Sequence, residues 1–396
     1  MQAERTPVIT GIGLVSALGD GAAAHWAALN AEGPFRPVVE ADRFAPYPIH
    51  PMAPLDLDRQ IPKRDQRQME PWQRIGVYAA GLALEQAGVK GEAALLDRTH
   101  LIVAAGGGER DTALDETLFA ALASAPEPDG LVGEQLMAGL RPTLFLAQLT
   151  NLLAGSISIV HGVVGSSRTF MGEEAAGADA LRIACARIAA CDGDLFLVGG
   201  SQNVERPEML LAYEMGGMLL KGPYAPVWAR QEAGGGIVLG SVGCFLVIEA
   251  LAHAMARGAR PIAALPAIAA DRSLRTRGAA TANAARQLET MRPLLDLPHV
   301  AVISAASGGS AATAEERAFL EALDLPFRAA ATALGSSGEP GFPAAVALAA
   351  LAVQSGTLFA PLEAAERPMR APLRQALVTG WGHWRGEAMA LVTAAA

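Results

Sequence analysis

Short apolar runs alternate along the chain with longer segments in which apolar residues recur every three or four positions. The apolar runs, most of which end at glycine, have the length and character of buried strands and lie at residues 6–13, 100–108, 195–201, 243–250, 300–309, 376–382 and 388–394. The segments with helical periodicity lie at residues 73–89, 176–191, 248–259, 314–325 and 344–356. This alternation of strands and helices predicts an α/β architecture with largely buried sheets.

The predicted helix at residues 176–191 begins just after two carboxylates, Glu173 and Glu174. Its larger apolar residues form one stripe, and small residues fill its first turns, so we expect those turns to be deeply buried. A carboxylate at a helix entrance gains about 0.3–1 kcal/mol from the free N–H groups there. The simplest interpretation of the two glutamates is therefore that they stabilise the helix start.

The composition is that of a folded protein with a large core, since 51% of the 396 residues are hydrophobic and 18% are charged. The succession of strands and helices recurs before and after about residue 250, which favours two similar halves, residues 1–250 and 251–396. A formal net charge of -9, without a cluster of lysine and arginine, argues against binding to nucleic acid or to an anionic membrane. A local basic patch could still bind an acidic protein.

Targeting and redox signals point to the cytoplasm. Three cysteines in apolar surroundings are too few for a disulfide framework or a metal site, which favours a reducing compartment. The N-terminus lacks the apolar core of a signal peptide, and the longest apolar run, at residues 343–353, is shorter than the roughly 20 residues that a membrane span needs. We therefore expect a cytoplasmic protein with no membrane span.

Common cofactor and catalytic motifs are incomplete. The sequence at residues 11–16 half-matches a dinucleotide fingerprint, but Ser16 replaces its third glycine and no acidic residue is suitably placed. No Gly-x-Ser-x-Gly motif is present, which argues against a serine hydrolase. The seven histidines are scattered without the spacing of metal ligands. The sequence therefore predicts no cofactor and no metal.

Several segments together resemble the β-ketoacyl-acyl carrier protein synthases, the condensing enzymes that share the thiolase fold. Residues 8–29 are similar to the family's opening strand, turn and helix, and residues 71–89, 155–203 and 238–263 follow in the family's order. The resemblance covers nearly the whole chain and is weaker in its C-terminal third. It implies two similar βαβ halves in a layered α-β-α-β-α architecture.

The residues that carry catalysis in that family are missing from the matching positions. Counting back three residues from Gly177 reaches Glu174, where active members have their nucleophilic cysteine. The motif of the first catalytic histidine puts Ala306 or Ser307 at its position, and the motif of the second puts Ser336 there. The family's lysine is absent as well. Because a carboxylate would form at best a labile mixed anhydride, the resemblance implies a chain that is no synthase on its own.

This pattern resembles the chain-length-factor subunits of type II polyketide synthases, which commonly carry glutamine at that position. The resemblance implies a heterodimer with an active ketosynthase, contact with an acyl carrier protein through that complex, and a pathway to aryl-polyene-like or aromatic polyketides or fatty-acid-like products. The strand before the nucleophile lies at the dimer interface of that family, which makes Arg168, Phe170 and Met171 expected interface residues. Glu174 is then expected to have a structural or gating role, with a catalytic role as the alternative.

Residues 108–140 are the most distinctive segment of the chain. In the resembled family this neighbourhood contributes to the dimer face and to the floor of the acyl tunnel. Leu118, Phe119 and Leu122 are therefore candidates for residues that stop chain growth, and ordinary helix packing is the equally weighted alternative. His383, which lies between two tryptophans, either faces a ligand or, as we favour, packs at the surface.

Two other functions stay open at the level of sequence. One is a malonyl-carrier-protein decarboxylase, which some family members with glutamine in place of the cysteine resemble. That reaction needs hydrogen-bond donors for an enolate, and both usual histidines are absent. The other is a scaffold that stabilises its partner without touching the product.

Overall fold

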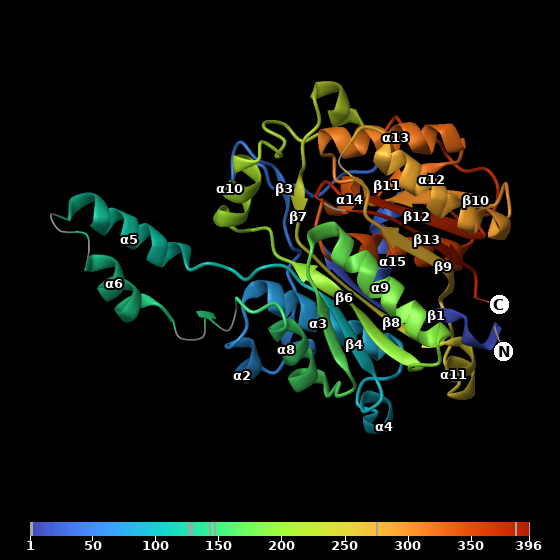
Figure 1. Ribbon diagram of the computed structural model, residues 1–396, viewed down its shortest axis with the longest axis horizontal. Helices are drawn as coiled ribbons and strands as arrows, with labels where there is room; N and C mark the ends of the chain where they lie inside the picture. The colour runs from blue at the N-terminus through green and yellow to red at the C-terminus, as the bar shows by residue number, and fades with distance from the viewer. Residues whose placement is uncertain are drawn as a thin grey trace.

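The computed structural model describes residues 3–125, 128, 130–141, 144–145, 148–274, 276–384 and 386–395. Its centre is an 11-stranded sheet (Figure 1), which contains two units with the same strand pattern. The first unit has the order β5-β4-β6-β8-β1, with β1 (Pro7–Ser16), β4 (His100–Ala104), β5 (Ser167–Phe170), β6 (Leu195–Gln202) and β8 (Val242–Ala250). The second has the order β11-β10-β12-β13-β9, with β9 (Ala263–Asp271), β10 (Val300–Ser304), β11 (Phe327–Ala329), β12 (Gln375–Trp381) and β13 (Glu387–Thr393).

The two units repeat each other in strand direction as well as in order. The first three strands of each order are parallel, and the fourth and fifth are each antiparallel to the strand before them. A short antiparallel contact, in which Val8 faces Ala264 and Ile9 faces Ala263, joins β1 to β9. The predicted pair of similar halves is therefore confirmed, and the predicted division after residue 250 falls between β8 and β9.

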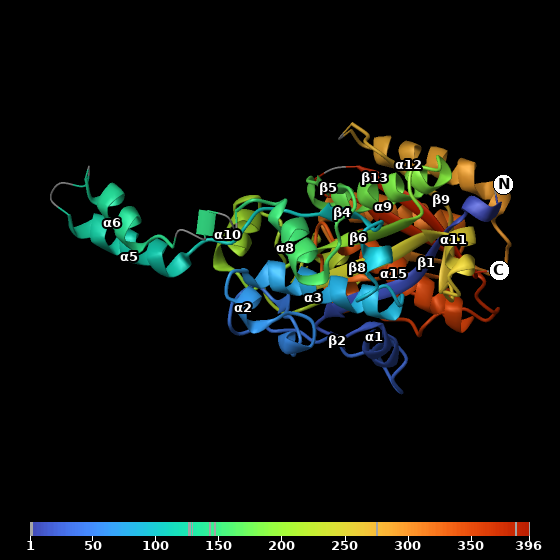
Figure 2. The same ribbon diagram turned by 90° about the horizontal axis from the view of Figure 1, so that it is seen from below.

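Helices form three layers, one on the outer face of each unit and one between the two units, as Figures 1 and 2 show. On the outer face of the first unit lie α3 (Pro71–Gln86) and α8 (Leu152–His161), and on the outer face of the second lie α12 (Ala279–Met291) and α13 (Ser310–Leu323). Between the units lie α9 (Glu173–Ala189) and α15 (Gly341–Ser355), which pack against each other and against strands of both units. Because α15 is buried on all sides from Phe342 to Val353, it can be apolar throughout. The layered α-β-α-β-α architecture is thus confirmed.

Glycines permit two close contacts inside these layers. A Cβ atom at Gly13 of β1 would lie 1.8 Å from the carbonyl oxygen of Ala79, so α3 packs directly on the strand backbone. A Cβ atom at Gly177 of α9 would lie 2.2 Å from the carbonyl oxygen of Glu339 and 2.6 Å from Cδ of Pro343. The first turns of α9 and the start of α15 therefore pack with their backbones in contact.

The remaining elements are short, except for one helical hairpin. Besides short 3-10 helices, the described ones are α1 (Ala22–Leu29), α2 (Lys63–Gln66), α4 (Ala93–Leu96), α10 (Pro207–Met215), α11 (Leu251–Ala256), α14 (Ala331–Leu334), β2 (Gly19–Asp20) paired with β1, and a separate sheet of β3 (Ile49–His50) and β7 (Leu239–Gly240). The hairpin consists of α5 (Thr112–Ser124) and α6 (Leu131–Gly139), and it projects away from the layered body (Figures 1 and 2). Neither of its helices contains a buried residue. None of the helices in the described ranges is long and apolar enough to cross a membrane.

Candidate functional site

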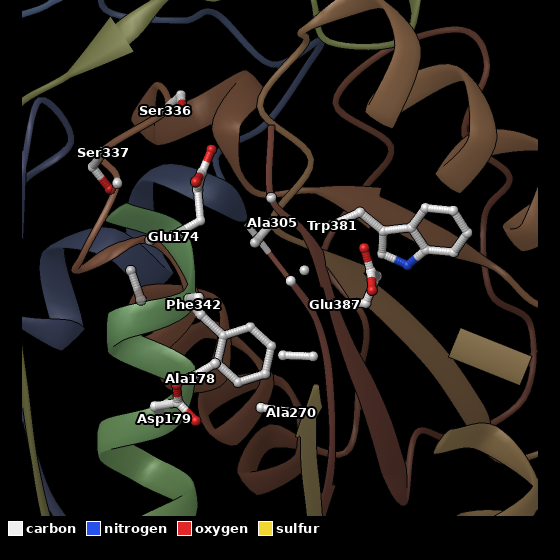
Figure 3. Close-up of a pocket in the computed structure, with 18 of the residues that line it drawn as sticks. Glu174, Ala178, Asp179, Ala270, Ala305, Ser336, Ser337, Phe342, Trp381 and Glu387 are labelled. Carbon is white, nitrogen blue, oxygen red and sulfur yellow. The ribbon is translucent and has the colours of Figure 1, made fainter. Parts of the chain in front are cut away.

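A cavity of about 330 Å³ lies at the entrance of α9, between α15, the loop after α14 and the turn that joins β12 to β13 (Figure 3). Small and apolar side chains form most of its wall. These are Ala175, Ala178, Ala270, Ala305, Ala330, Ala331, Leu334, Phe342, Ala344 and Ala388. At one end it is also lined by Asp179, which forms an ion pair with Arg182 (N···O 3.0 Å) and lies near Arg272. Glu174 and the serines of the loop line the other end.

Glu174 lies in the first turn of α9, after two residues with unusual backbone angles. Gly172 has a φ of 133°, and Glu173 has a φ of 49°, in the left-handed region that residues with a side chain rarely adopt. Such strain is typical of a sharp turn into a helix and amounts to about 1–3 kcal/mol. The strand β5 thus turns sharply into α9, and Glu174 is presented beside the cavity.

The two carboxyl oxygens of Glu174 differ in their surroundings. The backbone N–H of His383 donates a hydrogen bond to Oε1 at 3.0 Å. Oε2 is enclosed and has no hydrogen-bond partner among the described residues. Burial, followed by the nearby Glu173 carboxylate, raises the pKa of Glu174, while N–H groups of the helix start and of the β12–β13 turn oppose the rise. Within the described residues, the backbone hydrogen bond to the Glu174 side chain comes from His383 of the β12–β13 turn, and Glu174 forms no ion pair with Arg168.

The predicted position of the second histidine also borders the cavity. Ser336 and its neighbour Ser337 line it, and Figure 3 shows Glu174 pointing toward this loop from the top of α9. Backbone hydrogen bonds to β7 fix the loop, because the N–H of Ser336 donates to Val238 (2.8 Å) and the N–H of Gly240 donates to Ser336 (2.9 Å). The structure therefore brings Glu174 and Ser336 together at one end of the cavity.

The two predicted positions for the first histidine do not line this cavity. Ala306 belongs to the buried core of the second unit, and Ser307, which is also buried, accepts a hydrogen bond from the N–H of Gly309. The residue of this segment that borders the cavity is Ala305, directly after β10. Sequence reasoning missed it because the match to the family motif left the register open.

A third carboxylate, Glu339, lies close behind Glu173 and Glu174. It is only 5% exposed, and burial raises its pKa to about 7, with further increases from the two glutamates of α9 and an opposing effect of Arg206. The Glu174 end of the cavity is therefore acidic, whereas Arg182 and Arg272 line the cavity near Asp179. Additional negative charge would be unfavourable at the Glu174 end.

The groups that acyl transfer needs are absent from the described cavity wall. No cysteine, histidine or lysine is among the described residues that line it. Cys185 and Cys244 are buried in the core, where burial raises the pKa of the Cys185 thiol to about 12, and Cys191 is exposed beyond the far end of α9. No cluster of side chains suited to a metal ion is found in the described ranges. The cavity can thus hold a small ligand, but its wall offers no thiol nucleophile.

An open groove of about 600 Å³ lies on the other side of the β12–β13 turn. Its wall is formed by Leu274, Thr276, Arg277, Ala280, Ala311, Ala312, Ala314, Glu315, Ala318, Trp381, Gly382, His383 and Glu387. His383 therefore faces this groove, and its ring also packs edge-on against Trp384. The turn residues Trp381, Gly382 and Glu387 border both the groove and the cavity.

The predicted interface and tunnel residues lie away from the cavity. Arg168 and Phe170 are on β5, an edge strand whose second side is unpaired within the described chain, and Met171, which follows it, is 64% exposed. Phe119 of α5 is 70% exposed on the projecting hairpin, and Leu118 and Leu122 are half-buried there. Within this single chain none of these residues lines the cavity.

A basic patch that the sequence analysis missed is formed by α2 and the start of α3. Lys63, Arg67 and Arg74 line a shallow depression of about 300 Å³, and Arg64 lies in the same short helix. The four-residue spacing of Lys63 and Arg67 was the available signal, because residues that far apart share a helix face. A local positive surface is therefore present on a chain of net negative charge.

Comparison with known proteins gives a consistent result. Residues 5–254 match the family described as "Beta-ketoacyl synthase, N-terminal domain". The chain is 29% identical over 273 residues to nodulation protein E of Rhizobium leguminosarum bv. trifolii, a match covering 67% of this chain and 63% of that protein. It is 26% identical over 267 residues to 3-oxoacyl-[acyl-carrier-protein] synthase 2 of Vibrio cholerae, covering 65% of this chain and 61% of that one. The matched region thus spans less than two thirds of these relatives.

Solved structures with the same fold match over almost the entire chain. The ishigamide ketosynthase/chain length factor has a TM-score of 0.79 at 18% identity and covers 99% of this chain and 100% of its own. A type II polyketide synthase acyl-carrier protein in complex with its ketosynthase has a TM-score of 0.73 at 16% identity, with 98% and 99% covered. At sequence identities this low, the likeness shows a shared fold and nothing more.

Proposed function

Because the chain belongs to the β-ketoacyl synthase family, we propose that it is a catalytically incomplete, chain-length-factor-like subunit in the cytoplasm. It pairs with an active ketosynthase and shapes the acyl tunnel of a type II polyketide or fatty-acid-like pathway, with aryl-polyene-like and aromatic products as the two settings. One observation is the main support for this proposal. Glu174 lines the cavity at the start of α9, and no thiol, imidazole or lysine is among the described residues of its wall.

The chemistry of this wall argues against both condensation and decarboxylation. Acyl transfer needs a thiolate that can hold the chain, and the thiols of Cys185 and Cys244 are buried elsewhere. No imidazole is present among the described lining residues to stabilise the enolate, and at one end of the cavity a malonyl carboxylate would meet the carboxyl of Glu174. A malonyl-carrier-protein decarboxylase is therefore disfavoured.

Two surfaces support pairing with another subunit. The edge strand β5 offers unpaired backbone groups, and the projecting α5–α6 hairpin exposes Phe119 and Met137, the latter 90% exposed. Exposed apolar surface of this kind marks an interaction site. The basic patch at Lys63, Arg67 and Arg74 supports contact with an acidic carrier protein in the complex.

The first test is co-expression with a ketosynthase from the same gene neighbourhood. We expect native mass spectrometry to detect a one-to-one heterodimer that extends acyl carrier protein thioesters. The isolated chain should form no covalent acyl adduct and release no carbon dioxide from malonyl carrier protein. An adduct on the isolated chain would overturn the proposal, and carbon dioxide release would assign the decarboxylase function instead.

The second test separates tunnel control from a purely structural role. In the heterodimer, Phe119→Ala should lengthen the product, because removing a bulky side chain from the tunnel floor leaves room for further units. Met137→Ala, which removes another exposed apolar side chain from the other helix of the hairpin, is the matched control. Product lengths are compared by mass spectrometry. An unchanged distribution in Phe119→Ala would favour a scaffold.

A further inference from the structure

The α5–α6 hairpin presents negative charge next to exposed apolar side chains. Its segment, residues 112–140, contains no lysine or arginine. In α5 the exposed Glu116 lies three positions before the exposed Phe119. In α6 the exposed Glu134 lies three positions before the exposed Met137. Since residues three apart share a helix face, each helix presents a carboxylate beside a large apolar side chain.

The basic patch formed by α2 and the start of α3 is complementary to this hairpin in charge. Lys63 and Arg67 are both exposed, and Arg74 borders the same depression. Lys63 forms an ion pair with Asp58 at the surface, where the two side chains are 78% and 51% exposed (N···O 3.2 Å). Such exposed pairs contribute little to stability, so Lys63 can exchange one carboxylate for another. The long stems of lysine and arginine also offer apolar surface to a side chain such as Phe119.

The hairpin extends away from the basic patch of its own chain. It projects from the layered body, whereas α2 belongs to that body (Figures 1 and 2). At the base of the hairpin, Arg141 forms an ion pair with Glu70, the residue directly before α3 (N···O 3.1 Å). The base of the hairpin and the basic patch are therefore neighbours. Two copies related by a two-fold axis can each place the hairpin on the patch of the other, and this reciprocal contact closes.

We propose that two copies of this chain associate by exchanging their α5–α6 hairpins, each of which docks on the basic patch of the other copy. The inference goes beyond the proposed function and does not depend on it. The chain without a ketosynthase is then a homodimer in which both basic patches are covered. A ketosynthase that takes up the hairpin uncovers the patch.

Charge reversal tests the exchange in the full chain, with the dimer dissociation constant measured by analytical ultracentrifugation at low salt. Glu116→Lys with Glu134→Lys makes the hairpin basic, and Lys63→Glu with Arg67→Glu makes the patch acidic. Each double variant alone brings like charges together at both contacts. It should therefore raise the dissociation constant about tenfold or more. An equimolar mixture of the two double variants should regain the dimer, because both contacts in the mixed pair are complementary.

Arg292→Glu with Arg374→Glu is the matched control. It changes the net charge as much as the patch reversal does, but at exposed ion pairs of the second unit, and it should leave the dimer unchanged. Circular dichroism reports whether each variant is folded. The exchange is refuted if the parent chain is a monomer, if either reversed variant dimerises as tightly as the parent, or if the mixture stays monomeric.

The outcome is separate from the test of the proposed function. A dimer that survives either reversal would use another surface, such as the open edge of β5, and would overturn the inference alone. Condensation by the isolated parent chain would overturn the proposed function and leave the charge dependence of the homodimer unaffected. The two failures are therefore distinguishable.

Discussion

Gly177→Ala is expected to lower the free energy of unfolding by about 2–3 kcal/mol, which would make it one of the most damaging single-methyl additions in this chain. The added Cβ would lie 2.2 Å from the carbonyl oxygen of Glu339 and 2.6 Å from Cδ of Pro343. Neither obstacle is a flexible side-chain end, so α9 and α15 must move apart. Urea unfolding followed by circular dichroism measures the change.

A matched substitution shows whether close packing is the cause. Gly155 also lies inside a helix, α8, but its nearest neighbour for an added Cβ is a leucine methyl at 3.8 Å, an ordinary contact. Gly155→Ala should therefore be neutral or stabilising by up to about 1 kcal/mol, because alanine is the better helix former. If Gly177→Ala unfolds like the parent, α9 and α15 do not pack with their backbones in contact.

Glu339→Gln is expected to stabilise the protein at pH 8.5 and to have little effect at pH 5. Burial first, and then Glu173 and Glu174, raise the pKa of Glu339 from 4.5 to about 7. A carboxyl with a raised pKa contributes stability that is complete below about pH 4.5 and is lost as the pH rises through about 7. A shift of this size corresponds to about 3 kcal/mol at pH 8.5. Urea unfolding at both pH values gives the difference.

Glu249 provides a control of opposite sign. Burial opposes its ionisation, but hydrogen bonds from Arg257, His253 and Thr10 lower the pKa of Glu249 to about 2. Its stabilising contribution is therefore present above about pH 4.5, and Glu249→Gln should destabilise the protein at pH 5 and pH 8.5 alike. A Glu339→Gln variant that is destabilised more at pH 8.5 than at pH 5 would contradict the assigned protonation of this site.

The fold was largely predictable because buried strands appear in the sequence as short apolar runs and helices as apolar residues repeated every three or four positions. Strand β9 escaped detection, since its run of alanines contains Pro266, a residue that disfavours strand interiors. In the structure Pro266 is exposed. The residues of β9 before it pair with β1, and most of the residues that pair with β13 follow it. The pairing with β13 changes register at this point. A proline is tolerated there because the ladder is interrupted.

The candidate site was predictable only in part. Glu174 and Ser336, which both line the cavity, were each located by their fixed spacing to a glycine of a family motif. For the first histidine the match left Ala306 and Ser307 open, since nothing in an alanine-rich and serine-rich segment fixes the register, and the residue of this segment that lines the cavity is Ala305. The contact between Glu174 and His383 joins distant parts of the chain, and only the packing of α9 against the β12–β13 turn brings these residues together.

The α5–α6 hairpin has a practical consequence for handling the protein. The hairpin has no buried residue and β5 has an open edge, so both can associate with neighbouring copies in a concentrated solution. We therefore expect the chain to aggregate when it is overproduced alone. If the proposed ketosynthase partner covers these surfaces, making both chains together should increase the yield of soluble protein.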